Sequence, residues 1–450
     1  MDAMDAMDAL ASEVKASSEH HIIPKLYTKW MQYSGLFLPS LASINSGKLD
    51  RKNSHRAHFT WSCVILLLLL LLFAIDQYDF FVKFGQLLQD MEYFTCVAYD
   101  FRSLIKGQGP FTIGVMFLMR KKVSKLLQRC QQFLPTVLHE YDWQYLRRAF
   151  IVLCICTTVS IILCLSGIIF TTIALQETGY LERNQNVPYF FDQLKLPALL
   201  IAIFNGLGIY FGVSCEYLTL TLLVIIALHI FVAFKRVSLN FDAVVQNAGN
   251  ISQILGEFRN YLILVNLVDY LNKTFSPILL ISCVKDLISY AAQVGTYLQM
   301  YTTSVELSAE HTERSVAYMR GMDAFTFFFA QVSFVNMIIR IAVFCKMHTA
   351  AQSFRHRLRM IHLSEVNDDL KREITVFGQN TTISDGAVTV YGMLELSKEY
   401  VVTTFGLAMT YYIFVYQARD SQRSVEDLKS SQKSCQAAVH RILNGSLATV

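Results

Sequence analysis

The chain has 450 residues, of which 53% are hydrophobic and only 16% are charged, and its mean hydropathy is +0.37. Soluble domains carry about 25% charged residues, so this composition excludes an ordinary soluble protein and predicts an integral membrane protein with several spans. The net charge of +4, without a basic block that has interleaved aromatics, argues against nucleic acid as a partner. The 10 cysteines are too sparse for a disulfide scaffold.

Residues 1–56 are expected to form a disordered cytoplasmic segment. They begin with a threefold Met-Asp-Ala repeat and then mix charged and polar residues, and no apolar stretch precedes Trp61. Since a secretory signal peptide needs such a stretch, the first membrane span is expected to act as its own insertion signal. Trp61 at the start of that span is typical of an anchor at the membrane interface.

Seven stretches approach the roughly 20 mostly apolar residues that a helix needs to cross a bilayer. They are predicted at residues 59–78, 94–119, 149–174, 196–233, 261–300, 324–347 and 399–417. The second is the weakest, because it contains Asp100, Arg102 and Lys106. The fourth and fifth have about 40 residues each, nearly twice the hydrocarbon thickness at about 1.5 Å per residue, so both are expected to project beyond the membrane.

Lysine and arginine are concentrated in the loops on one side of these spans, and the positive-inside rule makes that side cytoplasmic. The fold class predicted is therefore an all-α membrane protein of seven transmembrane helices with its N-terminus cytoplasmic and its C-terminus extracellular, the inverse of a G-protein-coupled receptor. The expected segments are a cytoplasmic segment at 1–56, helices one to six at 57–345, a cytoplasmic anchor at 346–398, the seventh helix at 399–417 and an extracellular tail at 418–450.

Three segments carry a resemblance to a known family. They are FRNYLILVNLVDYLNKTFSPILLISC at Phe258–Cys283, FKRVSLN at Phe234–Asn240 and TYYIFVYQ at Thr410–Gln417. The last resembles the signature of the arthropod gustatory receptors, which is a Thr-Tyr pair, five mostly apolar residues and then Gln-Phe. Ala418 stands where the family has phenylalanine, and the resemblance covers residues 230–420.

The matching residues of the signature are Thr410, Tyr411 and Gln417, and Gly392 and Gly406 stand where the family tends to have glycine. The resemblance implies a tetrameric ligand-gated cation channel in the plasma membrane of sensory neurons, assembled as a homo- or heterotetramer with related receptors. It implies that the last helix of each subunit lines one central pore. It also implies that each subunit binds a small-molecule tastant in the outer half of its helix bundle.

Polar residues in the last span have the spacing of a pore helix. Thr403, Thr410 and Gln417 follow one another at intervals of seven, nearly on one face, and Tyr411 lies beside them. Such a line could replace the hydration water of passing ions. Hydrogen bonds between packed helices are the alternative role for Thr and Tyr.

Ionisable and polar residues also interrupt the fifth and sixth spans, where unpaired charge is costly. The stripe on the fifth span consists of Asp286, Tyr290, Gln293 and Tyr297, and the sixth span contributes Gln331 and Asn336. Acid, amides and aromatic rings together suit a small polar ligand, with a sugar as the favoured class. The alternative is a buried network that pairs Asp286 with Arg340 and merely holds two helices together. For Glu216, a satisfied polar contact is favoured over a role in ligand binding.

The remaining motifs indicate no enzyme, no cofactor and no metal site. Phosphate-binding glycine loops, nucleophile elbows and metal-spaced histidines are not visible. The basic stretch Arg355–His362 suggests a subunit anchor that contacts membrane lipid, in preference to a calmodulin site. Of four Asn-x-Ser/Thr sequons, only Asn444 is expected to meet the glycosylation machinery. A G-protein-coupled receptor of opposite orientation and a transporter are the competing functions.

Overall fold

A computed structural model describes the backbone over most of the chain. The described residues are 22–23, 25–36, 59–75, 77–78, 93–177, 198–246, 251–306, 313–360, 371–372, 375–378, 386–407, 409–410, 413–414, 417, 431–432 and 436. Side chains near the ends of some long helices lie outside this description, among them those of residues 288–333.

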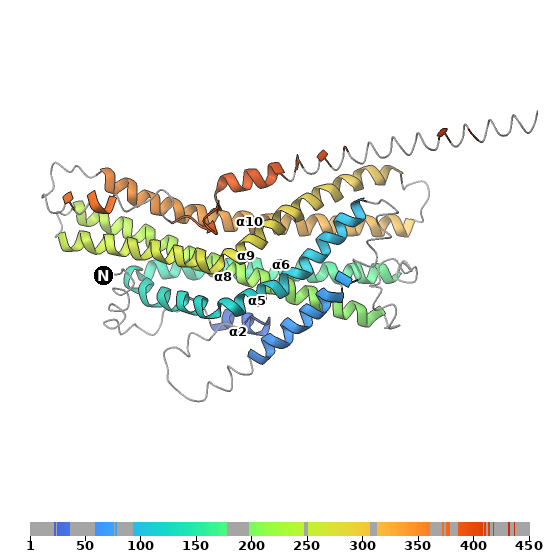
Figure 1. The fold of residues 1–450 in the computed structure, drawn as a ribbon, viewed down its shortest axis with the longest axis horizontal. Helices are drawn as coiled ribbons and strands as arrows, with labels where there is room; N and C mark the ends of the chain where they lie inside the picture. Colours follow the sequence, from blue (N-terminus) through green and yellow to red (C-terminus); the bar gives the residue numbers. More distant parts are fainter. Residues whose placement is uncertain are drawn as a thin grey trace, which may run out of the picture.

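Long helices dominate the fold and run side by side along the molecule (Figure 1). They are α2 (Lys25–Tyr33), the helix Phe59–Ile75, α5 (Tyr93–Val137), α6 (Glu140–Glu177), α8 (Ala198–Gln246), α9 (Ile251–Glu306), α10 (Glu313–Met360) and a last helix at 398–407. Among the described residues, four helices are long and apolar enough to cross a membrane. They contain Glu140–Leu163, Tyr210–Val245, Ser252–Leu287 and Phe334–Leu358, and Phe59–Ile75 is a shorter apolar helix.

The helices are longer than the sequence analysis expected. The prediction of overlong fourth and fifth helices is confirmed, since α8 has 49 residues and α9 has 56. However, α5 with 45 residues and α10 with 48 also exceed the bilayer thickness. The apolar stretches in the sequence predicted only the apolar part of each helix. Polar turns that pack against other parts of the protein extend each helix beyond that part.

Helix α8 is the centre of the bundle and packs against α5, α6, α9 and α10. Of its most apolar stretch 94% is buried inside the protein, compared with 22% for α6. The exposed side chains of α6 include Ile151, Ile155 and Ile162. Helix α8 is therefore enclosed by other helices, whereas α6 presents an apolar face that suits contact with lipid.

Part of the N-terminal segment is folded, and the prediction of disorder for residues 1–56 was wrong there. Helix α2 buries Tyr27 and Met31 in the main core, together with Ile22 and Leu36 on either side of it. The Tyr27 hydroxyl donates a hydrogen bond of 2.7 Å to the carbonyl of Leu218 in α8. One apolar face is enough to anchor so short a helix, although the surrounding composition is polar.

The segment 346–398 was predicted as one cytoplasmic anchor, and it contains several elements. Helix α10 continues to Met360, and Phe354 in this extension packs on Tyr261 of α9 with ring centroids 4.5 Å apart. Phe258 and Phe377 stack at 4.5 Å beside them. These rings bury a large apolar area and hold the ends of α9 and α10 together.

A two-stranded hairpin follows, made of β1 (Thr389–Val390) and β2 (Leu394–Glu395) in antiparallel register. Tyr391, Gly392 and Met393 connect the strands, and the first two have φ angles of 53° and 71°. Positive φ at two adjacent residues is the geometry of primed hairpin turns, and glycine adopts it without steric cost. The last helix begins directly after this hairpin.

Candidate functional site: a buried charge cluster

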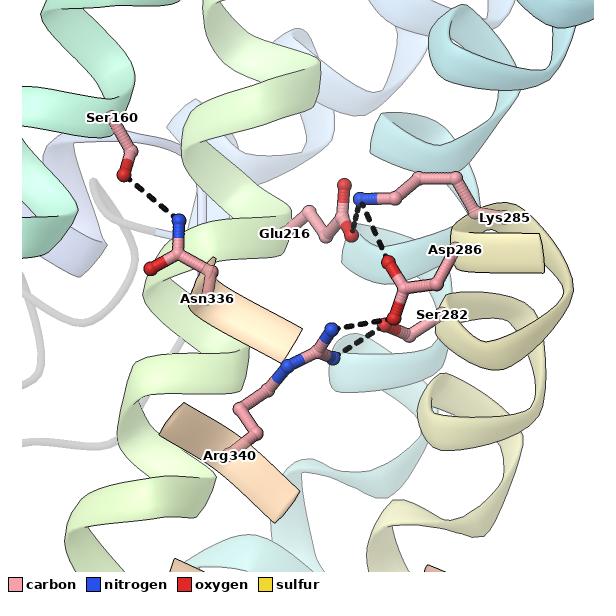
Figure 2. Close-up of polar contacts among 7 residues, drawn as sticks. All are labelled: Ser160, Glu216, Ser282, Lys285, Asp286, Asn336 and Arg340. Carbon is pink, nitrogen blue, oxygen red and sulfur yellow. Dashed lines mark hydrogen bonds and ion pairs between the residues drawn. The ribbon is translucent and has the colours of Figure 1, made fainter. Parts of the chain in front are cut away.

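Four charged side chains meet inside the bundle between α8, α9 and α10 (Figure 2). Lys285 of α9 donates to the Glu216 carboxylate of α8. The adjacent Asp286 accepts a hydrogen bond of 2.6 Å from Arg340 of α10, and Asp286 Oδ1 lies 3.9 Å from Lys285 Nζ. The two acids and the two bases, called here the charge cluster, sum to zero net charge.

The charge cluster is removed from solvent. The side chains of Glu216, Lys285 and Asp286 are each 7% exposed or less, and that of Arg340 is 11% exposed. Charges at such depth are stable only when they are paired and hydrogen-bonded. The Ser282 hydroxyl supplies a further acceptor for Arg340 at 2.6 Å, so its guanidinium binds two side chains of α9.

Two hydroxyl contacts connect α6 to the same region. Asn336, one turn before Arg340 on α10, donates to the Ser160 hydroxyl at 2.9 Å, as Figure 2 also shows. The hydroxyls of Thr157 and Thr221 lie 2.7 Å apart between α6 and α8. Four helices are therefore linked by polar contacts at one level of the bundle, which fixes their relative rotation.

A small cavity of about 30 Å³ lies beside the charge cluster, with Asp286, Asn336 and Thr157 in its lining. Lys285 also borders it, with its ammonium 5.5 Å from the centre of the Tyr217 ring. This volume suits one or two water molecules, whereas pockets for drug-sized ligands have volumes of about 300–1,000 Å³. The cavity as it stands does not hold a sugar.

The structure describes the side chains of only two of the six predicted ligand-binding residues, Asp286 and Asn336. Asp286 and Asn336 both line the cavity, and Asp286 forms an ion pair with Arg340, the pairing that the sequence offered as the alternative to a ligand site. Glu216 is satisfied by Lys285, in agreement with its interpretation as a polar contact. The side chains of the other members lie outside the described residues; these are Tyr290, Gln293, Tyr297 and Gln331.

The predicted pore residues lie on a helix that this single chain leaves largely uncovered. Thr403, Thr410 and Gln417 are all exposed, and the Thr410 hydroxyl donates to the carbonyl of Gly406 at 2.9 Å. Tyr411 and the predicted glycan site Asn444 lie outside the described residues.

Apolar side chains of the same helix are exposed as well. Val402 is 72% exposed and Phe414 is 64% exposed. Near the start of the helix, Tyr400 packs against the main core. The last helix is thus attached to the bundle at its beginning, and beyond that point it offers both apolar and polar side chains to its surroundings.

The sequence indicated the pairing of Asp286 with Arg340 but not the other polar contacts at this level of the bundle. It did not pair Glu216 with Lys285, which are 69 positions apart, or Asn336 with Ser160, which are 176 apart. An isolated charge in an apolar run is costly, so the sequence indicates that such a residue needs a partner. It does not indicate which residue that partner is. Within the described residues, no group of three His, Cys, Asp or Glu side chains is placed to hold a metal ion.

No protein-family model matches the sequence, and no curated protein matches it significantly. Among solved structures, the chain is similar to the insect olfactory receptor OR5 from Machilis hrabei in complex with eugenol, with a TM-score of 0.67 at 12% identity, over 88% of this chain and 97% of that one. A second structure of the same receptor gives a TM-score of 0.66 at 11% identity and the same coverage. Both are receptors rather than enzymes. The chain therefore has the fold of an insect olfactory receptor.

Proposed function

We propose that this protein is a chemoreceptor of the gustatory type that acts as a ligand-gated, non-selective cation channel. The observation that carries the proposal is the olfactory-receptor fold, which extends over 88% of the chain. The gustatory assignment rests on the Thr410, Tyr411 and Gln417 signature in the last span. The same fold disfavours the alternative of a G-protein-coupled receptor with the opposite orientation.

The proposed assembly is a tetramer, formed by identical or related subunits in the plasma membrane of sensory neurons, with seven spans in each subunit. Its N-terminus is cytoplasmic and its C-terminus extracellular. The exposure of Val402, Phe405 and Phe414 supports this arrangement, because a helix with uncovered apolar side chains needs lipid or another subunit around it. Four copies of the last helix would then place Thr403, Thr410 and Gln417 around one ion path.

The proposed ligand is a small polar tastant, and a sugar is the favoured class. Its site is the outer part of the bundle, beyond the charge cluster, where Tyr290, Gln293 and Tyr297 continue along α9 and Gln331 lies on α10. The charge cluster and its water-sized cavity form the inner boundary of that site. Since the similar olfactory receptor was solved in complex with eugenol, a ligand panel should combine sugars with small phenols.

The test is agonist-evoked current in cells whose G-protein signalling is blocked. Gln417→Ala should change single-channel conductance, rectification or basal leak while leaving the half-maximal agonist concentration nearly unchanged. Gln417→Lys should suppress cation current, because four positive charges raise a barrier to cations. Gln422→Ala, in the predicted tail, is the matched control and should conduct as the wild type does.

Current that disappears when G-protein signalling is blocked would refute the channel proposal. A Gln417→Ala protein that reaches the cell surface with unchanged conductance and leak would refute the pore assignment alone.

A further inference from the structure

The hairpin before the last helix is held on α9 by the side chains of two residues. The Asn272 amide nitrogen donates to the carbonyl of Ala387 at 2.9 Å, and its oxygen accepts from the Thr389 N–H at 3.2 Å. One turn further along α9, the Ser276 hydroxyl oxygen accepts from the Tyr391 N–H at 3.0 Å. Together these three hydrogen bonds form what is called here the hairpin joint.

The chemistry of the hairpin joint depends on these two side-chain types. A carboxamide offers one donor and one acceptor, so Asn272 pairs with β1 as the backbone of a neighbouring strand would. Ser276 also donates to the Asn272 carbonyl at 2.6 Å, which fixes its hydroxyl oxygen toward the hairpin. Asn272 begins a glycosylation sequon, but its amide is already engaged with the hairpin.

The opposite side of the hairpin is fitted against α10. Gly386 has a φ of 77°, and a Cβ atom added there would lie 2.5 Å from the Cβ of Ala351. His348 of α10 lies 3.1 Å from the Glu395 carboxylate. With Val388 and Leu396 buried in the main core, the hairpin is clamped between α9 and α10.

The two helices that clamp the hairpin also carry the charge cluster. On α9 the joint and Asp286 are separated by about 20 Å of helix, at about 1.5 Å per residue. Pro277 lies between them and cannot donate to the carbonyl four residues earlier, but α9 is continuous from Ile251 to Glu306 through this position. A movement of α9 at the ligand side therefore reaches the hairpin through a single helix.

The connection from the hairpin to the last helix has little slack. Strand β2 ends at Glu395, the Ser397 N–H bonds back to the Glu395 carbonyl at 3.0 Å, and the last helix begins at Lys398. A hairpin that shifts or tilts must therefore move the start of the last helix.

We propose that the hairpin joint transmits movement of α9 to the last helix, so that Asn272 and Ser276 set how readily the pore opens. The inference rests on the proposed function. It assigns both as positioning residues, since neither belongs to the proposed ligand site or ion path. Loss of one hydrogen bond in only one of two states changes their equilibrium constant about two- to tenfold.

The experiment compares substitutions that differ in hydrogen bonding. Asn272→Asp keeps the acceptor and loses the donor. Ser276→Val loses the hydroxyl, whereas Ser276→Thr has the same branching as valine and keeps it. Lys273→Gln, on the exposed side of the same turn, is the control.

Each variant is measured for surface amount, basal current, half-maximal agonist concentration, single-channel conductance and reversal potential. Asn272→Asp and Ser276→Val should shift the half-maximal concentration or the basal open fraction at least threefold, with conductance and reversal potential unchanged. Ser276→Thr should lie closer to the wild type than Ser276→Val does, and Lys273→Gln should match the wild type. If Ser276→Val does not reach the surface, Ser276→Ala removes the same hydroxyl with less steric change and replaces it.

Wild-type gating in both Asn272→Asp and Ser276→Val would overturn this inference but not the proposed function. A change confined to conductance would have the same consequence. A wild-type protein without agonist-evoked current would overturn the proposed function and the inference together. Hydrogen exchange at the Thr389 and Tyr391 amides then shows separately whether the joint itself exists, since Ser276→Val should speed exchange at Tyr391 and leave a remote amide unaffected.

Discussion

Replacing Asp286 with asparagine tests whether the buried charges stabilise the fold as pairs. The substitution keeps the size of the side chain but leaves Arg340 without the carboxylate that it binds at 2.6 Å. Arg340 Nε already has no hydrogen-bond acceptor within the described residues, so Ser282 and the uncharged amide oxygen of the new asparagine would be the remaining acceptors close to the guanidinium. Lys285 keeps Glu216, and the charge cluster acquires one net positive charge.

Removing one partner of a buried ion pair costs about 3–5 kcal/mol. We expect the lower end, about 3 kcal/mol, because Glu216 still attracts the Arg340 guanidinium. Since 1.4 kcal/mol is a factor of ten, the ratio of folded to unfolded protein should fall by roughly a hundredfold or more. The double variant Asp286→Asn with Arg340→Met removes both charges and should cost about 1 kcal/mol, which is about 2 kcal/mol less than Asp286→Asn alone.

The assay is the fraction of detergent-solubilised protein that stays monodisperse after heating, measured together with surface biotinylation. Asp269→Asn, an exposed carboxylate on the same helix, is the control and should cost about 1 kcal/mol or less. The pairing argument is wrong if Asp286→Asn is as heat-stable as the wild type. It is equally wrong if the double variant is no more stable than Asp286→Asn.

Three further predictions concern the ligand, the topology and the hairpin. Gln293→Leu should raise the half-maximal agonist concentration roughly five- to a hundredfold, since an unpaired buried group costs about 1–3 kcal/mol; an unmoved dose–response curve would place the pocket elsewhere. Digestion with a glycosidase should remove one glycan at most, which Asn444→Gln abolishes, and a glycan on a loop expected to be cytoplasmic would contradict the topology. Gly386→Ala should lower the yield of folded protein, because its Cβ meets Ala351 at 2.5 Å and its φ of 77° is strained by about 1–2 kcal/mol. Adding Ala351→Gly removes the clash and should restore part of that yield, and no restoration would show that the contact is not the cause.

The sequence alone predicted the fold class, because the signal for a membrane helix is local. An apolar run of bilayer length has few alternatives to a helix, since every backbone polar group must be satisfied within the segment. This reasoning found α8 and α9, including their unusual length, and it found that Asp286 and Arg340 require partners. The short signature ending at Gln417 resembles that of the gustatory receptors, and the structure has the fold of an insect olfactory receptor.

The sequence could not give the contacts that depend on how the helices are rotated against one another. Tyr27 is buried because α8 offers a carbonyl 191 positions away, which no local pattern of the polar N-terminal segment reveals. The sequence marks Asn272 only as the first residue of a glycosylation sequon, because its partners lie in a hairpin 115 and 117 positions later.

The partners inside the charge cluster were likewise decided by the tertiary structure. Glu216 could have paired with either Lys285 or Arg340 on grounds of charge. Packing of α9 and α10 around α8 places Lys285 beside Glu216 and directs Arg340 toward Asp286. Hydropathy and spacing along one chain determine which residues need a partner, and the fit of side chains between helices selects which partner they find.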